Sequence, residues 1–205
     1  MALLSTAAIG VELGRWHSGH NECRSTKFIF GIAAILLIVV AGVGVVEAQS
    51  NSEYQIKAAY LYNFGKFVQW PSGAFSGPSD PFRICILGES PFDQKLESAF
   101  SSRKIQNHPV HVIYPDSIAQ SRKCHVLFLS PSESGHMKAI VADLRSDAVL
   151  TVADTPGFIS AGGMIRFFLE EDSVRFEMNP SPASQAGLKI SSKLLVLGTK
   201  HSSRR

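Results

Sequence analysis

Two cysteines could form a disulfide bond in this 205-residue chain. Cys85 and Cys124 are the only cysteines that follow Cys23 in the sequence. An isolated pair offers too few ligands for a metal site, and a thiol oxidoreductase normally shows Cys-x-x-Cys spacing. In an exported protein an even pair indicates a disulfide, which would stabilise the fold by roughly 4 kcal/mol for this separation. The alternative is a pair of buried free thiols on neighbouring strands.

The histidines and acids show no arrangement that would catalyse a reaction. The histidines after residue 50 lack the His-Glu-x-x-His spacing and other metal-ligand spacings, and no Gly-x-Ser-x-Gly elbow is present. Asp154 ends an apolar run, where α/β enzymes place catalytic groups, but no base or nucleophile accompanies it. We expect Asp154 to cap the turn that begins at Thr155, and we expect neither an enzyme nor a metal or other cofactor.

A glycine cluster follows Asp154 and could be mistaken for a phosphate-binding loop. Gly157, Gly162 and Gly163 are followed by Met164, whereas a Walker loop ends in Gly-Lys-Ser/Thr. The Gly-x-Gly-x-x-Gly pattern is also absent. The cluster therefore indicates a tight connection in which glycine permits positive φ or a close backbone approach.

The first 48 residues have the pattern of an export signal. Residues 28–46 carry no charged or polar side chain, follow Arg24 and Lys27, and lead to a small residue, Ala48. This pattern predicts a secretory signal peptide that is cleaved after residue 48, although the long stretch before it would also fit a start codon assigned too far upstream. The alternative is an anchor in the inner membrane, because residues 28–46 are just long enough to cross it. Either way, we expect the following domain in the periplasm.

Composition limits the class of the remaining chain. With 45% hydrophobic residues, 18% charged residues and a net charge of +3, the chain is neither disordered nor basic enough to indicate nucleic-acid binding. We expect one domain over residues 49–198 and a polar tail over residues 199–205.

Apolar runs that alternate with helical patterns predict the fold. We expect strands over 82–87, 108–114, 124–129 and 148–152, and helices over 52–68, near 91–100 and around 137–144. Strands that are apolar on both faces indicate a mainly parallel sheet covered on both sides. Residues 164–169 and 174–178 then predict an antiparallel hairpin, and residues 181–197 predict a final helix. The fold class is therefore α/β, as a single three-layer α/β/α domain.

Several segments together resemble a known family. They are Lys57–Phe64 running on to Trp70-Pro71, Ile84–Gly88, Cys124–Phe128, Leu150–Asp154, Gly157-Phe158, Gly162–Ile165, Arg175–Asn179 and Gly187–Leu195. In this order, and over nearly all of residues 53–197, they resemble the YfiR/HmsC-like family of periplasmic regulators.

The resemblance implies a regulator and not an enzyme. Proteins of this kind hold an inner-membrane diguanylate cyclase in check, so that loss of inhibition raises cyclic di-GMP and biofilm output. An OmpA-like outer-membrane lipoprotein that sequesters the regulator and a second copy of the chain are further partners to expect. Cys85 and Cys124 match one cysteine pair of the family, and the chain lacks the second pair found in some members.

The loop after residue 153 is the first place to look for a contact surface, because exposed loops carry recognition more often than packed strands. The candidate residues are Asp154, Gly157, Phe158, Gly162, Gly163 and Met164. The alternative function is a small-molecule sensor domain that serves a histidine kinase or an outer-membrane receptor system. Its ligand would lie in a cleft near the strand ends at Gly88, Ser130 and Asp154, since ligands prefer such crevices in open α/β sheets.

Overall fold

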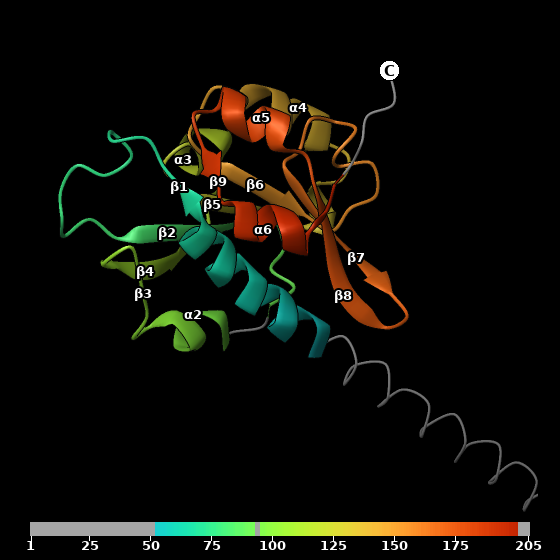
Figure 1. Ribbon diagram of the computed structural model, residues 1–205, viewed down its shortest axis with the longest axis horizontal. Coiled ribbons are helices and arrows are strands. Elements are labelled where there is room, and N and C mark those ends of the chain that lie inside the picture. The colour runs from blue at the N-terminus through green and yellow to red at the C-terminus, as the bar shows by residue number, and fades with distance from the viewer. Residues whose placement is uncertain (1–51, 93–94, 201–205) are drawn as a thin grey trace, which may run out of the picture. The chain divides into compact units, whose positions relative to one another are not determined.

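The computed structural model describes residues 52–92 and 95–200 (Figure 1). The expected signal peptide, its cleavage site and residues 201–205 of the expected tail lie outside these residues. Within the described ranges, no helix is long and apolar enough to cross a membrane.

A mixed eight-stranded sheet forms the centre of the domain, with strand order β10-β8-β7-β6-β5-β2-β4-β3. The neighbouring strands β4, β2, β5, β6 and β7 pair in parallel, as the apolar runs predict for the first four. The strands are β2 (Phe82–Leu87), β3 (Lys104–Ile105), β4 (His108–Ile113), β5 (Val126–Leu129), β6 (Leu150–Ala153), β7 (Ile165–Glu170), β8 (Ser173–Met178) and β10 (Thr199–Lys200).

Helices cover both faces of this sheet, which confirms the three-layer α/β/α architecture. Along β2, Ile84 and Ile86 belong to one core cluster, while Cys85 and Leu87 belong to the other. The first cluster packs against the N-terminal helix (residues 52–67), α2 (Lys95–Phe100), α5 (Pro180–Gln185) and α6 (Ser192–Leu197). The second packs against α3 (Ile118–Ser121) and α4 (Met137–Asp143).

The antiparallel hairpin is present and its tight turn has a definite geometry. β7 pairs with β8 over their full length, and the alternate residues Val174, Phe176 and Met178 of β8 are buried. Glu171 and Asp172 connect the strands with φ of 47° and 59°. Two consecutive left-handed residues match the twist of the strands in a two-residue turn, although asparagine and glycine usually occupy such positions.

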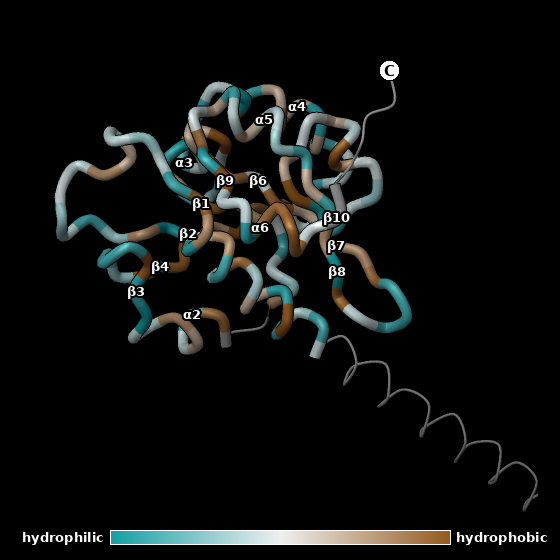
Figure 2. The backbone as a smooth tube through the Cα atoms, in the orientation of Figure 1, coloured by the Kyte–Doolittle hydropathy of each residue, from teal (hydrophilic) through white to brown (hydrophobic). Residues whose placement is uncertain are grey.

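The single C-terminal helix expected over residues 181–197 is wrong. Gly187 adopts φ of 76°, and the Leu188 amide donates to the Ala183 carbonyl, which closes α5. Residues Lys189–Ile190 then form β9, which pairs antiparallel with β1 (Val68–Gln69). Ser191 caps α6, whose last residue, Leu197, is 69% exposed. Figure 2 shows α6 as a hydrophobic segment.

Other element ends differ from the expectation by a few residues. The N-terminal helix stops at residue 67 because β1 begins at Val68, and residues 91–92 are not helical although the helix was expected to start near them. Ser90 accepts a hydrogen bond from the Phe92 amide, which forms a local turn ahead of the helix.

Candidate functional site

A cleft of about 570 Å³ lies beyond the carboxyl-terminal ends of β5 and β6. The start of the N-terminal helix, the loops after both strands and strand β7 contribute its walls. The lining residues are Glu53, Tyr54, Lys57, Pro131, Ser134, Asp154, Thr155, Pro156, Arg166, Phe167, Phe168 and Leu169. Its size lies in the range of small-molecule sites, and its position matches the usual place for ligands in α/β sheets.

A buried lysine joins the N-terminal helix to the end of β6. Lys57 is only 3% exposed, and its Nζ lies 2.6 Å from Asp154 Oδ2 and 2.6 Å from Glu53 Oε1. Glu53 is one helical turn before Lys57, so both side chains occupy the same helix face. The Tyr54 hydroxyl donates to the same Asp154 oxygen at 2.9 Å, and Lys57 Nζ lies 4.2 Å from the centre of the Tyr54 ring.

The charges of this cluster do not balance. Lys57 brings one positive charge against the carboxylates of Glu53 and Asp154. Asp154 Oδ1 is buried and has no hydrogen-bond partner among the described residues. Burial, reinforced by the Asp154 carboxylate, raises the pKa of Tyr54, so its hydroxyl stays protonated and donates. The cluster therefore keeps a net negative charge at the wall of the cleft.

The opposite wall is mainly apolar, and its cation already has a partner. Arg166 Nε lies 2.5 Å from Glu177 Oε1, and the guanidinium lies 5.6 Å from the centre of the Phe168 ring. Leu169 is 52% exposed. This wall offers apolar contact and a guanidinium whose charge is already neutralised.

Asp154 is the expected site residue that lines the cleft. Its side chain contacts Tyr54 and Lys57 of the N-terminal helix, across the sheet edge, instead of capping the turn at Thr155. The reason is that a buried ammonium compensates the carboxylate better than the amides of an exposed turn.

Three of the five other expected surface residues lie inside the fold. Phe158, Gly163 and Met164 are buried, whereas Gly157 is exposed and Gly162 is half-buried. A Cβ on Gly163 would come within 2.3 Å of the Phe158 ring, so glycine permits this close approach. These buried residues shape the loop and leave Asp154 and Gly157 to face the surroundings.

The expected ligand crevice agrees only in part with the cleft. Asp154 lines it, and Ser130 directly precedes the lining residue Pro131, while Gly88 is absent from its walls. Ser130 is 1% exposed, and its hydroxyl has no partner among the described side chains and backbone groups.

Sequence reasoning missed Lys57, although a signal was present. Lys57, Leu61, Phe64 and Val68 follow helical spacing, so the lysine begins the buried stripe of the N-terminal helix. A charged residue in such a position requires a buried partner. That partner is 97 residues away, and the sequence does not identify it.

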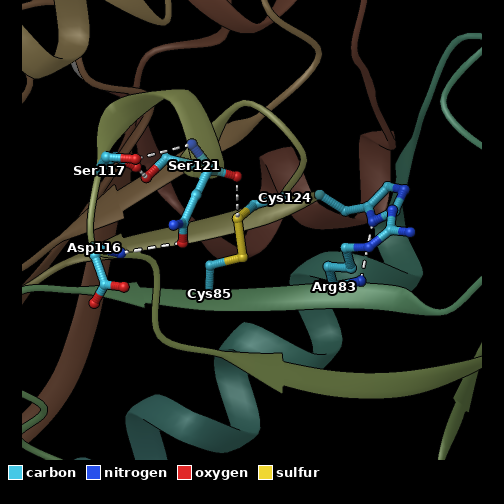
Figure 3. Close-up of a disulfide and its surroundings, with 8 residues drawn as sticks. Arg83, Cys85, Asp116, Ser117, Ser121 and Cys124 are labelled. Atoms are coloured by element: carbon cyan, nitrogen blue, oxygen red, sulfur yellow. Dashed lines mark hydrogen bonds between the residues drawn. A yellow bond between two sulfur atoms is a disulfide. The ribbon is translucent and has the colours of Figure 1, made fainter.

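Cys85 and Cys124 form a disulfide in the structure, with Cα atoms 6.0 Å apart (Figure 3). The bond joins β2 to the short segment between α3 and β5, on the sheet face that α4 covers. Within the described ranges, no group of three or more histidine, cysteine or acidic residues could hold a metal ion.

A stack of rings lies at the opposite, amino-terminal edge of the sheet. Phe75 stacks between His108 and His125, with ring centres 3.8 Å and 4.3 Å away, and His125 stacks on Phe82 at 4.7 Å. The Arg83 amide donates to His125 Nδ1, which leaves the ring proton on Nε2, 3.2 Å from the Ala74 carbonyl. Burial lowers the pKa of His125 to about 4, so the ring is neutral near pH 7.

Comparison with known families gives one match. A family model described as YfiR/HmsC-like matches residues 54–199. The matched range contains the disulfide, the ring stack, Lys57 and Asp154.

Proposed function

The chain belongs to the YfiR/HmsC-like family, and we propose that it inhibits an inner-membrane diguanylate cyclase by direct contact from the periplasm. This family is a regulatory one, known for periplasmic regulation of diguanylate cyclases. The match over residues 54–199 is the observation that carries the proposal. Inhibition would lower cyclic di-GMP and, with it, exopolysaccharide and biofilm output.

The mechanism would be a shift between two states of the cyclase. A regulator that binds the quiescent state more tightly than the active state moves the population by its difference in affinity. A hundredfold preference corresponds to about 2.7 kcal/mol, and one well-packed apolar contact together with one charge pair can supply a difference of that size.

We place the contact at the tip of the β7–β8 hairpin and the neighbouring loop after β6. Leu169 is 52% exposed beside the charged residues Glu170, Glu171 and Asp172. The hairpin extends away from the body of the sheet, where a partner could reach it (Figure 1). An OmpA-like lipoprotein that sequesters the regulator would compete with the cyclase for binding to it.

The test is the cellular cyclic di-GMP level in a deletion strain. We expect deletion to raise cyclic di-GMP, and we expect the exported protein, but not a cytoplasmic version, to reverse the rise. Leu169→Asp should fail to restore inhibition, whereas Val196→Asp, at an 84% exposed position on α6, should restore it. An unchanged level after deletion, under conditions where the gene is expressed, would refute the proposal.

A small-molecule sensor domain is the second candidate, and the cleft favours it. The cleft has the volume, the position and the mixed polar and apolar walls of a ligand site. A sensor kinase or an outer-membrane receptor encoded beside the gene would support this function, and a membrane cyclase would support the first. A rise in Tm with pools of metabolites would show that the protein binds a ligand.

A further inference from the structure

The cluster at the wall of the cleft needs one more positive charge. Lys57 compensates one of the two carboxylates that it contacts, so one negative charge of the cluster has no cation among the described residues that form it. A partly buried carboxylate without full compensation exerts a stronger field than the same group in water. The group that complements this wall is therefore a cation.

The other charges near the cleft also favour a cation over an anion. Arg166 is paired with Glu177, so it adds no free positive charge that would attract an anion. The adjoining hairpin tip carries Glu170, Glu171 and Asp172 against Arg175. This region is acidic although the whole chain has a net charge of +3. The local field therefore concentrates cations at the cleft.

The remaining walls of the cleft indicate which kind of molecule would carry the positive charge. Pro131, Pro156, Phe168 and Leu169 line the cleft with apolar surface, and its volume of about 570 Å³ exceeds that of an inorganic ion many times. A molecule that fills such a space buries an apolar body and presents one charged group.

We propose that this cleft binds a small organic cation, with an ammonium group against the carboxylates of Glu53 and Asp154 and an apolar body against Phe168 and Leu169. Glu53 is 23% exposed and Asp154 is 12% exposed at the side chain, so both present an edge to the cleft. This site does not depend on the proposed inhibition of a cyclase, and it names the ligand class for the sensor function.

The experiment is isothermal titration of the protein as it is purified after export, with tyramine as the probe. Tyramine has an ammonium group and a flat apolar body, and 4-hydroxyphenylacetate has a similar body with the opposite charge. We expect saturable binding of tyramine that is at least tenfold tighter than binding of the acid. The cyclic di-GMP assay is separate, so failure of one proposal does not imply failure of the other.

Two variants test the site and one serves as the control. Asp154→Asn removes the charge with little change in shape and should weaken tyramine binding at least tenfold. Ser134→Trp places a large side chain in the cleft from an exposed position that is not part of the ion cluster, and it should also abolish binding. Asp147→Asn removes a carboxylate that pairs with Arg122 outside the cleft and should leave binding unchanged.

Circular dichroism and Tm would show that each variant is folded. Should Asp154→Asn unfold, Ser134→Trp still tests the location of the site. Equal binding of tyramine and the acid, unchanged binding in Ser134→Trp, or no binding of tyramine at millimolar concentration would overturn the proposal.

Discussion

The N-terminal helix and the loop that follows it are held to the two ends of the strands by different interactions. At the carboxyl-terminal edge, the ammonium of Lys57 holds the start of the N-terminal helix to Asp154. At the amino-terminal edge, stacking of Phe75 between His108 and His125 holds the loop that follows this helix. The first edge is charged and borders a cleft, whereas the second is closely packed and holds His125 in its neutral form near pH 7.

This difference indicates that one edge of the sheet is suited to binding a further group and that the other edge is closed. A charged cluster with an incomplete set of partners can accept a further group, so the carboxyl-terminal edge is suited to recognition. The ring stack leaves His125 2% exposed and satisfies both ring nitrogens, so it closes its edge of the sheet. The stack holds only while His125 is neutral, and acid should weaken it.

Removal of the buried ammonium should have the largest effect on stability. In Lys57→Met, two carboxylates would lie together without a cation, and we expect the free energy of unfolding to fall by about 3–5 kcal/mol. Urea denaturation followed by circular dichroism would measure the loss. Lys66→Met changes an exposed lysine of the same helix and should cost under about 0.5 kcal/mol. A similarly small loss of unfolding free energy in both variants would show that the ion pairs of Lys57 do not stabilise this edge.

Acid should destabilise the amino-terminal edge of the sheet. The pKa of His125 is about 4 in the folded protein against a usual 6.5, so the unfolded chain binds the proton more readily. The stabilisation is present above pH 6.5 and is lost as the pH falls toward 4, by roughly 3 kcal/mol from this residue.

The pH dependence can be assigned with two histidine variants. His125→Phe keeps a ring but cannot be protonated, so the loss of stability between pH 6.5 and 4 should shrink. His136→Phe alters a histidine whose side chain is 79% exposed and should retain the loss. Stability curves with equal slopes in His125→Phe and the original protein would contradict the assignment.

Removal of the central ring should weaken the same edge and also expose His125. Phe75 is half-buried, so Phe75→Ala should cost about 2 kcal/mol, less than the loss of a fully buried phenylalanine. Exposure should also raise the pKa of His125 toward its usual value, which NMR titration would show. Phe168→Ala, at the cleft, should not move this pKa. An unchanged His125 pKa in Phe75→Ala would show that other groups bury the ring.

The smallest effect concerns the tyrosine at the charged edge. Tyr54→Phe removes the hydroxyl that donates to Asp154 while keeping the ring beneath Lys57. We expect a loss of about 1–2 kcal/mol in urea denaturation, as for a hydrogen bond to a charged acceptor. Tyr62→Phe, whose exposed hydroxyl donates to the Lys104 carbonyl, should lose less. A larger loss in Tyr62→Phe would show that the Tyr54 hydroxyl contributes little.

Local patterns predicted the strands of the sheet well, because apolar runs such as 82–87 reflect burial on both faces. The C-terminal segment was predicted poorly, because β9 exists through pairing with β1, more than 100 residues earlier. The same limit applies to the site. Asp154 was expected at a strand end, but its contact with Lys57 depends on how the helix packs, and no short-range pattern encodes that packing.

The disulfide has a consequence for the order in which the strands of the domain can assemble. Both cysteines precede β6, β7 and β8 in the chain. They join β2 to the start of β5, and these two strands pair with each other directly. The bond can therefore close as soon as residue 124 is available, before β6, β7 and β8 have joined the sheet. The later strands would then add to an edge that is already covalently fixed.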